Sequence, residues 1–277
     1  MRSIIGRSVE GREMVLLANF PLRGDPAAVR SDPRSTLLIG GTHGDERATV
    51  AILDNFAASR LGPGGLAHPV AVLSLHNPDG HAADMRYNAR GVDLNRNFTH
   101  NWSPDSEEPA GPVPLSEPET AALHAFILAR RPAKIVSLHW ALSEIDADGP
   151  QSTALALAMW GALSEEERKP YRLRVHRPEA PAASFCPGSL GQWCGNGLVY
   201  PDGSRPAMVT LELPYHAQAY ERPDSLPDGH LESVRALWRA RPEAYLAGVQ
   251  GPVHRMLEAA CRLGHASGAP APAAEAG

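Results

Sequence analysis

Residues 36–46 read Thr-Leu-Leu-Ile-Gly-Gly-Thr-His-Gly-Asp-Glu: a short apolar strand, two glycines, and a polar turn that leads into a helical pattern. In open α/β sheets, ligands bind just beyond the carboxyl ends of the strands. His43 and Glu46 stand three residues apart at this turn, so they can point to one side and share a metal ion. A second such pair, His176 and Glu179, lacks the glycines and contains a proline. We interpret it as a strand end and loop.

Short β-rich runs alternate with helical patterns outside this stretch, which favours a single α/β domain with a largely parallel or mixed sheet. The predicted strands are Met14–Asn19, Thr36–Ile39, Val70–Ser74, Lys134–Leu138, Tyr171–His176 and Met208–Leu213. The predicted helices are Glu46–Ser59, Glu117–Arg130, Ser152–Glu167, Leu231–Ala247 and Pro252–Leu263. Ser116 and Glu119 predict a capping box before the second of them. The domain is expected to span residues 1–265. Residues 266–277 are a low-complexity Ala/Pro/Gly tail that we expect to be disordered.

Composition and charge exclude several classes of function. The 277 residues include 26 Lys and Arg and 31 Asp and Glu, which gives a net charge of −5. This charge does not favour binding to nucleic acid or to an anionic membrane. The longest apolar run, residues 154–163, is about half the length of a membrane helix. The first residues show no secretion signal, so we expect a cytoplasmic protein. Cys186 and Cys194 are expected to be free thiols there, with a regulatory disulfide as the alternative.

Two further predicted strands carry polar side chains that are suited to metal binding or to acid–base catalysis. His139 follows the apolar strand Lys134–Leu138, so a second imidazole can reach the same sheet edge as His43 and Glu46. Two His and one Glu form the ligand set of catalytic zinc sites, although His139 alone could be a buried core histidine. Glu212 lies within the strand Met208–Leu213. It is either a solvent-facing residue of an edge strand or, near a metal, a general base.

The segment from Arg86 to Phe98 is rich in polar side chains, with three arginines, three asparagines and Asp93. Such a segment is compatible with a polar surface loop. It is equally compatible with an anion site, because guanidinium groups bind carboxylates in a bidentate manner and stabilise developing oxyanions.

Taken in order, these segments resemble the zinc carboxypeptidases of the carboxypeptidase A superfamily, and within it the bacterial murein peptide amidases. The resemblance covers about residues 4–215. The matching segments are His43-Gly-Asp-Glu46, Asn77-Pro-Asp-Gly80, Gly91-Val-Asp-Leu-Asn-Arg-Asn-Phe98, Ser137-Leu-His139, Pro187-Gly-Ser-Leu-Gly-Gln-Trp193 and Thr210-Leu-Glu-Leu213.

The resemblance implies a twisted, mostly eight-stranded mixed sheet with helices on both faces, and a role for each matching residue. His43, Glu46 and His139 would bind one zinc ion, and Asp93 would orient His43. Glu212 would be the general base, and Arg86 would stabilise the oxyanion. Asn95 and Arg96 would hold the free carboxylate of a small peptide substrate. The implied reaction removes diaminopimelate from the tripeptide L-Ala-γ-D-Glu-diaminopimelate in cytosolic cell-wall recycling.

Two departures from the family pattern lie where specificity is set. The tyrosine expected near Ser184 is missing, and Tyr200 or Tyr215 are the candidates to replace it. The third ligand is followed by Trp140, which is either a wall of the substrate pocket or a core aromatic residue.

The motifs are also compatible with other functions. The chain could be a carboxypeptidase on other peptides, a zinc deacylase like aspartoacylase or succinylglutamate desuccinylase, or a binding module without catalysis. The segments Thr-Leu-Glu-Leu-Pro and Pro-Gly-Ser-Leu-Gly-Gln-Trp favour the amidases over the deacylases. The sequence gives no indication of the oligomeric state.

Overall fold

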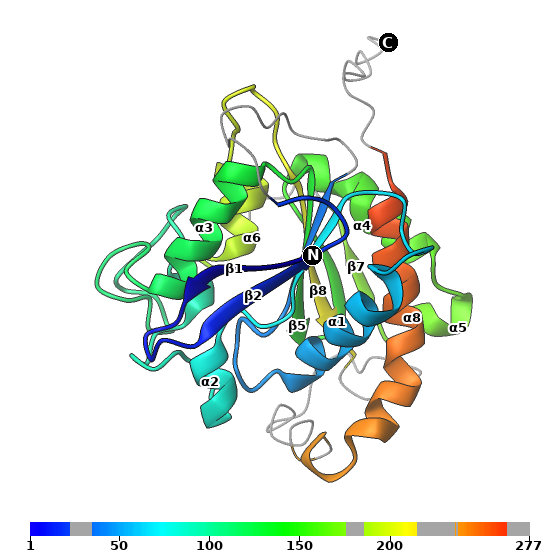
Figure 1. Ribbon diagram of the computed structural model, residues 1–277, viewed down its shortest axis with the longest axis horizontal. Coiled ribbons are helices and arrows are strands. Elements are labelled where there is room, and N and C mark those ends of the chain that lie inside the picture. The colour runs from blue at the N-terminus through cyan, green and yellow to red at the C-terminus, as the bar shows by residue number, and fades with distance from the viewer. Residues whose placement is uncertain (23–34, 176–185, 215–235, 237, 265–277) are drawn as a thin grey trace, which may run out of the picture.

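Eight strands form one mixed sheet in a computed structural model that describes residues 1–22, 35–175, 186–214, 236 and 238–264 (Figure 1). The strand order is β1-β2-β4-β3-β5-β8-β6-β7. The strands are β1 (Arg2–Arg7), β2 (Glu13–Ala18), β3 (Thr36–Ile39), β4 (Val70–Leu73), β5 (Lys134–Trp140), β6 (Glu144–Asp148), β7 (Arg172–Arg174) and β8 (Ala207–Leu213). The longer helices are α1 (Arg47–Arg60), α3 (Pro118–Arg130), α4 (Thr153–Gly161) and α8 (Pro242–Arg262). The short ones are α2 (Pro78–Ala83), η2 (Leu94–Arg96), η3 (Pro150–Ser152), α5 (Glu165–Arg168), α6 (Leu190–Gln192) and η4 (Trp193–Gly197).

The middle of the sheet is parallel, from β4 through β3 and β5 to β8, so that the carboxyl ends of these strands meet at one edge. β3 and β5 are buried along their whole length, as expected for strands that are covered on both faces. The antiparallel strands β2 and β6 flank this parallel core. The expected eight-stranded mixed sheet is thereby confirmed.

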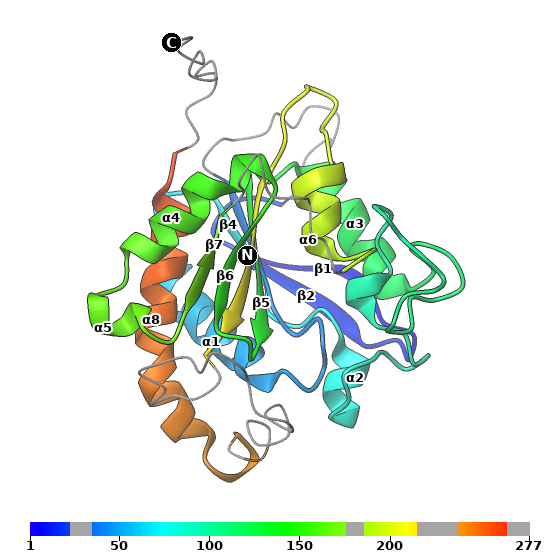
Figure 2. The ribbon, with the colours of Figure 1, turned by 180° about the vertical axis from the view of Figure 1, so that it is seen from behind.

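Helices cover both faces of the sheet, and each face has its own apolar cluster (Figures 1 and 2). On one face, α1, α4 and α8 pack side chains such as Phe56, Met159 and Leu257 against the sheet. On the other face, α3 and α6 contribute Leu123, Ile127 and Leu190. The face under α3 and α6 also carries the polar site described below.

Several sequence predictions of local structure differ from the observed elements. The predicted capping box at Ser116 is wrong, because no side chain caps α3 and the Ser116 hydroxyl instead donates to Glu117. The capping box that does occur joins Ser164 and Glu167 at α5, a helix separate from α4. The predicted helix break before Pro252 is also wrong, since α8 runs through that residue.

Some predictions concern residues outside the described ranges: the pair His176 and Glu179, the segment around Ser184, Tyr215 and the tail from residue 266. Across the part of the chain that is described, no helix combines the length and the apolar character needed to cross a bilayer.

Candidate metal centre and catalytic site

The loop between β3 and α1 carries two of the predicted ligands, and its glycines allow its tight path. Gly41 has a φ of +58°, a left-handed conformation that side chains other than glycine disfavour. A Cβ on Gly44 would lie 2.1 Å from the carbonyl carbon of Gly80, so only glycine lets this loop pack against α2. The Thr49 hydroxyl accepts from the Gly41 amide and donates to the Glu46 carbonyl, which closes the loop.

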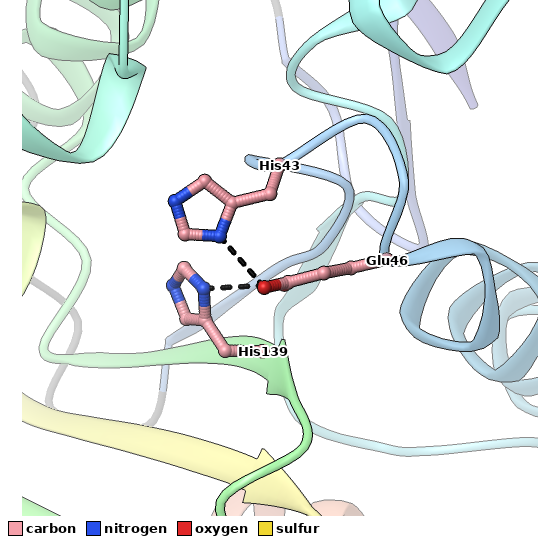
Figure 3. Close-up of side chains that lie close together, drawn as sticks. All are labelled: His43, Glu46 and His139. Carbon is pink, nitrogen blue, oxygen red and sulfur yellow. Dashed lines mark hydrogen bonds and ion pairs between the residues drawn. The ribbon is translucent and has the colours of Figure 1, made fainter. Parts of the chain in front are cut away.

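The three predicted metal ligands converge in space (Figure 3). His43 Nδ1 lies 2.7 Å from Glu46 Oε1, and His139 Nδ1 lies 3.3 Å from Glu46 Oε2. One ligand atom from each residue lies within 4.8 Å of the other two. All three residues are buried, with exposed fractions of 3–6%.

The donor set fits a divalent metal. Asp93 Oδ1 lies 3.2 Å from His43 Nε2 and accepts its proton, which leaves the Nδ1 lone pair directed at a carboxylate oxygen of Glu46. Two such electron-rich atoms repel each other unless a cation lies between them. Burial opposes positive charge on His43, yet the carboxylates of Glu46 and Asp93 outweigh it and raise the pKa of His43 to about 9. The site therefore favours a cation at this point.

Asp93 links the metal site to Arg86. The Asp93 carboxylate is fully buried, and its Oδ2 accepts from Arg86 Nε at 3.2 Å and from Nη2 at 2.8 Å. Burial alone would raise the pKa of Asp93, but His43 and Arg86 hold it well below its usual range. Arg86 Nη1 lies 3.3 Å from His43 Nδ1, so a guanidinium group stands directly beside the predicted ligands.

Asn95 and Arg96 follow Asp93 in the short helix η2. Asn95 Oδ1 accepts from the Leu190 amide at 3.0 Å, which ties η2 to α6. Arg96 donates to the Asn95 carbonyl, and within the described ranges no carboxylate forms a salt bridge with it. Its charge is therefore available to an anionic ligand.

Glu212 stands beside His139, because the two residues are register partners on β8 and β5. Glu212 Oε2 accepts from the Leu142 amide at 3.3 Å. Burial, together with the charge of Glu46, raises the pKa of Glu212 to about 8. A partly exposed carboxyl group with a pKa near neutrality is suited to general acid–base chemistry.

The structure shows the surroundings of Trp140 and Tyr200, the two aromatic residues for which the sequence left alternatives. Trp140 is a core residue: only 6% of it is exposed, and its ring packs against Trp238 and Tyr245 at centroid distances of 5.9 and 5.1 Å. Tyr200 is also buried, and its hydroxyl donates to the carbonyl of Pro132, next to the start of β5. Tyr200 is therefore unable to replace the missing tyrosine at the site.

Cys186 is half-buried and Cys194 is fully buried, and both are free thiols. Burial raises the pKa of each. The sequence pattern did not predict β6 (Glu144–Asp148), which pairs with β8 beside the site. The signal was present in Glu-Ile-Asp-Ala-Asp at 144–148, where carboxylates alternate with apolar residues at the period of a strand.

Comparisons with known proteins agree with this geometry. The model of the zinc carboxypeptidase family matches residues 1–141. Murein peptide amidase A of Escherichia coli K12 is 36% identical over 207 residues, which cover 69% of this chain and 75% of that protein. The enzyme of the same name from Vibrio campbellii is 34% identical over 238 residues, with 80% and 84% covered. The crystal structure of murein-tripeptide amidase from Escherichia coli O157 superposes with a TM-score of 0.54 at 27% identity, covering 86% of this chain and 91% of that one.

The chain belongs to the zinc carboxypeptidase family. It is a hydrolase of the metallopeptidase and amidase type, with the α/β fold of that family.

Proposed function

We infer that this chain hydrolyses the γ-D-Glu–diaminopimelate amide bond of the tripeptide L-Ala-γ-D-Glu-diaminopimelate, and that it does so in the cytoplasm as part of peptidoglycan recycling. The observation that carries the chemistry is the convergence of His43, Glu46 and His139, with Glu212 beside His139. The choice of substrate is supported by the murein peptide amidases, which are 34–36% identical to this chain.

The three converging residues would hold a single zinc ion, with Asp93 fixing the tautomer of His43. The chemistry that a bound zinc ion would supply there is that of a Lewis acid, which would polarise the scissile carbonyl group and lower the pKa of water toward neutrality. Glu212 accepts a proton from the attacking water and passes it to the amine of diaminopimelate as the C–N bond breaks. Arg86 Nη1, beside His43, donates to the carbonyl oxygen as it gains negative charge.

Asn95 and Arg96 would bind the carboxylate of the departing residue. Arg96 has no carboxylate partner among the described residues, so a substrate carboxylate would complete its pairing. An arginine next to a planar carboxamide suits a carboxylate, because the guanidinium group binds it in a bidentate manner. This contact would restrict cleavage to the C-terminal residue.

The test is mass spectrometry of the products after zinc-loaded protein is incubated with L-Ala-γ-D-Glu-meso-diaminopimelate. We expect free diaminopimelate and the dipeptide L-Ala-γ-D-Glu, and no release after removal of the metal with a chelator. Release of the C-terminal residue from ordinary dipeptides, but not from this tripeptide, would support the metallopeptidase chemistry and contradict the proposed substrate. Cell fractionation tests the proposed location. Recovery of the protein outside the cytoplasmic fraction would contradict it.

A further inference from the structure

Arg86 and Asp93 lie at the two ends of one tight loop. Between them, the Asn88 amide donates to the Val92 carbonyl at 3.0 Å. The side chain of Asn88 closes the same turn, because its Oδ1 accepts from the amides of Arg90 and Val92, each at 3.0 Å. Asn88 is only 5% exposed. One buried side chain therefore fixes the turn that brings Asp93 back to Arg86.

The other end of the Asn88 side chain contacts two carboxylates at the start of α3. Its Nδ2 donates to Glu117 Oε2 at 2.7 Å and to Glu119 Oε2 at 3.3 Å. Both glutamates are buried, with exposed fractions of 1% and 0%. The carboxamide thus uses both of its donor hydrogens and its acceptor oxygen. An aspartate at this position would place a third acceptor against the two carboxylates, so the position requires a donor.

Glu119 also connects to the loop that carries His43. Burial lowers the pKa of His76 to about 4, so its ring is neutral and has one donor and one acceptor nitrogen. Its Nε2 donates to the Glu119 carbonyl at 3.3 Å, and its Nδ1 accepts at 3.3 Å from the hydroxyl of Thr42, the residue before His43. The second carboxylate oxygen of Glu119 accepts from the Val9 amide at 3.1 Å. The first turn of α3 is therefore bonded to both loops of the site.

The distance between Arg86 and His43 depends on how these two loops are held together. Arg86 Nη1 lies 3.3 Å from His43 Nδ1. The Arg86 carbonyl accepts from the Gly44 amide and from Asn77 Nδ2, each at 3.3 Å, which is long for such bonds. The 2.7 Å bond from Asn88 is shorter and ends on a carboxylate, and such bonds are about twice as strong as those between neutral groups. We therefore expect Asn88 to restrain the loop more than either of the other contacts.

Resting on the proposed function, in which Arg86 donates to the oxyanion, we propose that Asn88 is a positioning residue. Its carboxamide ties the loop of Arg86 and Asp93 to the start of α3 and so holds the guanidinium group beside His43. Asn88 acts through Arg86 and not on the substrate. Because the bond from Arg86 to the oxyanion strengthens in the transition state, loss of the tie should lower kcat more than it raises KM. A displacement of about 1 Å in such a group costs roughly 100-fold in rate.

The experiment measures kcat and KM for L-Ala-γ-D-Glu-meso-diaminopimelate at saturating zinc. Asn88→Asp keeps an oxygen that accepts from Arg90 and Val92 and removes the donor to α3. We expect kcat to fall by about 10- to 100-fold and KM to stay within about threefold. Glu119→Gln tests the same contact from α3, because a glutamine cannot accept from both Val9 and Asn88. Its kcat should fall as well, so this variant remains informative if Asn88→Asp folds poorly.

A double-mutant cycle with Arg86→Gln separates positioning from a general loss of structure. The glutamine retains a donor for Asp93 but has no guanidinium group to place at the oxyanion. If Asn88 acts through Arg86, adding Asn88→Asp to Arg86→Gln should change kcat by less than about threefold. An equal loss of kcat from Asn88→Asp in both backgrounds would overturn the inference. A wild-type kcat in both Asn88→Asp and Glu119→Gln would overturn it too.

Ile127→Val is the control for stability, because Ile127 is an apolar residue buried on the same helix, α3. It should lower the midpoint of urea denaturation and leave kcat unchanged, which shows that a weaker α3 does not by itself reduce turnover. Cleavage by wild type together with an unchanged kcat in the two network variants would reject this inference while the proposed function stands. If zinc-loaded wild type does not cleave the tripeptide, the proposed function and this inference fail together.

Discussion

His139 and Glu212 face each other across two parallel strands, β5 and β8, as direct register partners. Because partners in register project to the same face, this pairing fixes the predicted third ligand beside the predicted base without any loop between them. The Leu142 amide, three residues beyond His139, then donates to Glu212 Oε2. The strand that supplies the ligand therefore also leads into the turn that orients the base.

Replacement of this base separates catalysis from metal binding. Glu212→Gln keeps the size of the side chain but removes the proton acceptor, so we expect kcat to fall by about 10²- to 10⁴-fold. Glu212 is not one of the converging ligands, so zinc content measured by mass spectrometry should equal that of wild type. Turnover of the variant at the wild-type rate would contradict the assigned role.

Asp93 is expected to act on the metal through His43. Asp93→Asn leaves a side chain that can present its NH₂ group to His43 Nε2, which disturbs the tautomer that directs Nδ1 to the metal. Zinc affinity should fall by about 10- to 100-fold, as measured by competition with a chromophoric chelator. Activity should recover at saturating zinc to the extent that Arg86 keeps its position. An unchanged affinity would show that Asp93 serves only Arg86.

The sequence predicts the candidate site best where the type of a residue and its position at the end of a strand together indicate its role. Glycines at 40 and 41 after an apolar run indicated the strand-to-helix turn, and His139 at a strand end indicated the shared edge. The motifs also placed Asp93 and Arg86 in one segment. The motifs did not predict that Arg86 donates a hydrogen bond to the Asp93 carboxylate. Hydrogen bonds between side chains occur at no fixed separation in sequence, so no pattern indicates them.

The strands that escaped prediction, β1 and β6, lack the apolar pattern on which strand prediction depends. β1 is an edge strand with exposed arginines at both ends, and β6 alternates carboxylates with Ile145 and Ala147. The charged side of β6 is explained by its neighbour β8 and by the polar site on that face, neither of which is local in sequence. α8 shows the reverse case, since buried Val249 and Val253 on either side of Pro252 keep the helix packed through a residue that disfavours it.

Trp140 should act on stability. Its ring contacts Trp238 and Tyr245 in the core, so Trp140→Ala leaves a large cavity and should lower the free energy of unfolding by about 3–5 kcal/mol. Urea denaturation followed by circular dichroism measures this loss. At a temperature where the variant remains folded, KM should stay close to that of wild type. A large increase in KM without loss of stability would assign Trp140 to substrate binding.

The raised pKa of Asp148 should make the stability of the fold depend on pH. The pKa of Asp148 is raised from 3.8 to about 7 by burial and by Asp146, so the folded chain holds this proton more tightly than the unfolded chain. The resulting stabilisation is present at low pH and is lost as pH rises from about 4 to about 7. The asparagine in the Asp148→Asn variant cannot ionise, so the variant does not lose this stabilisation as the pH rises. The free energy of unfolding of wild type relative to this variant should therefore fall by roughly 2.5 kcal/mol between pH 5 and pH 8, measured by urea denaturation. A difference that stays constant over this range would show that Asp148 is ionised throughout and that its pKa is not raised in the folded chain.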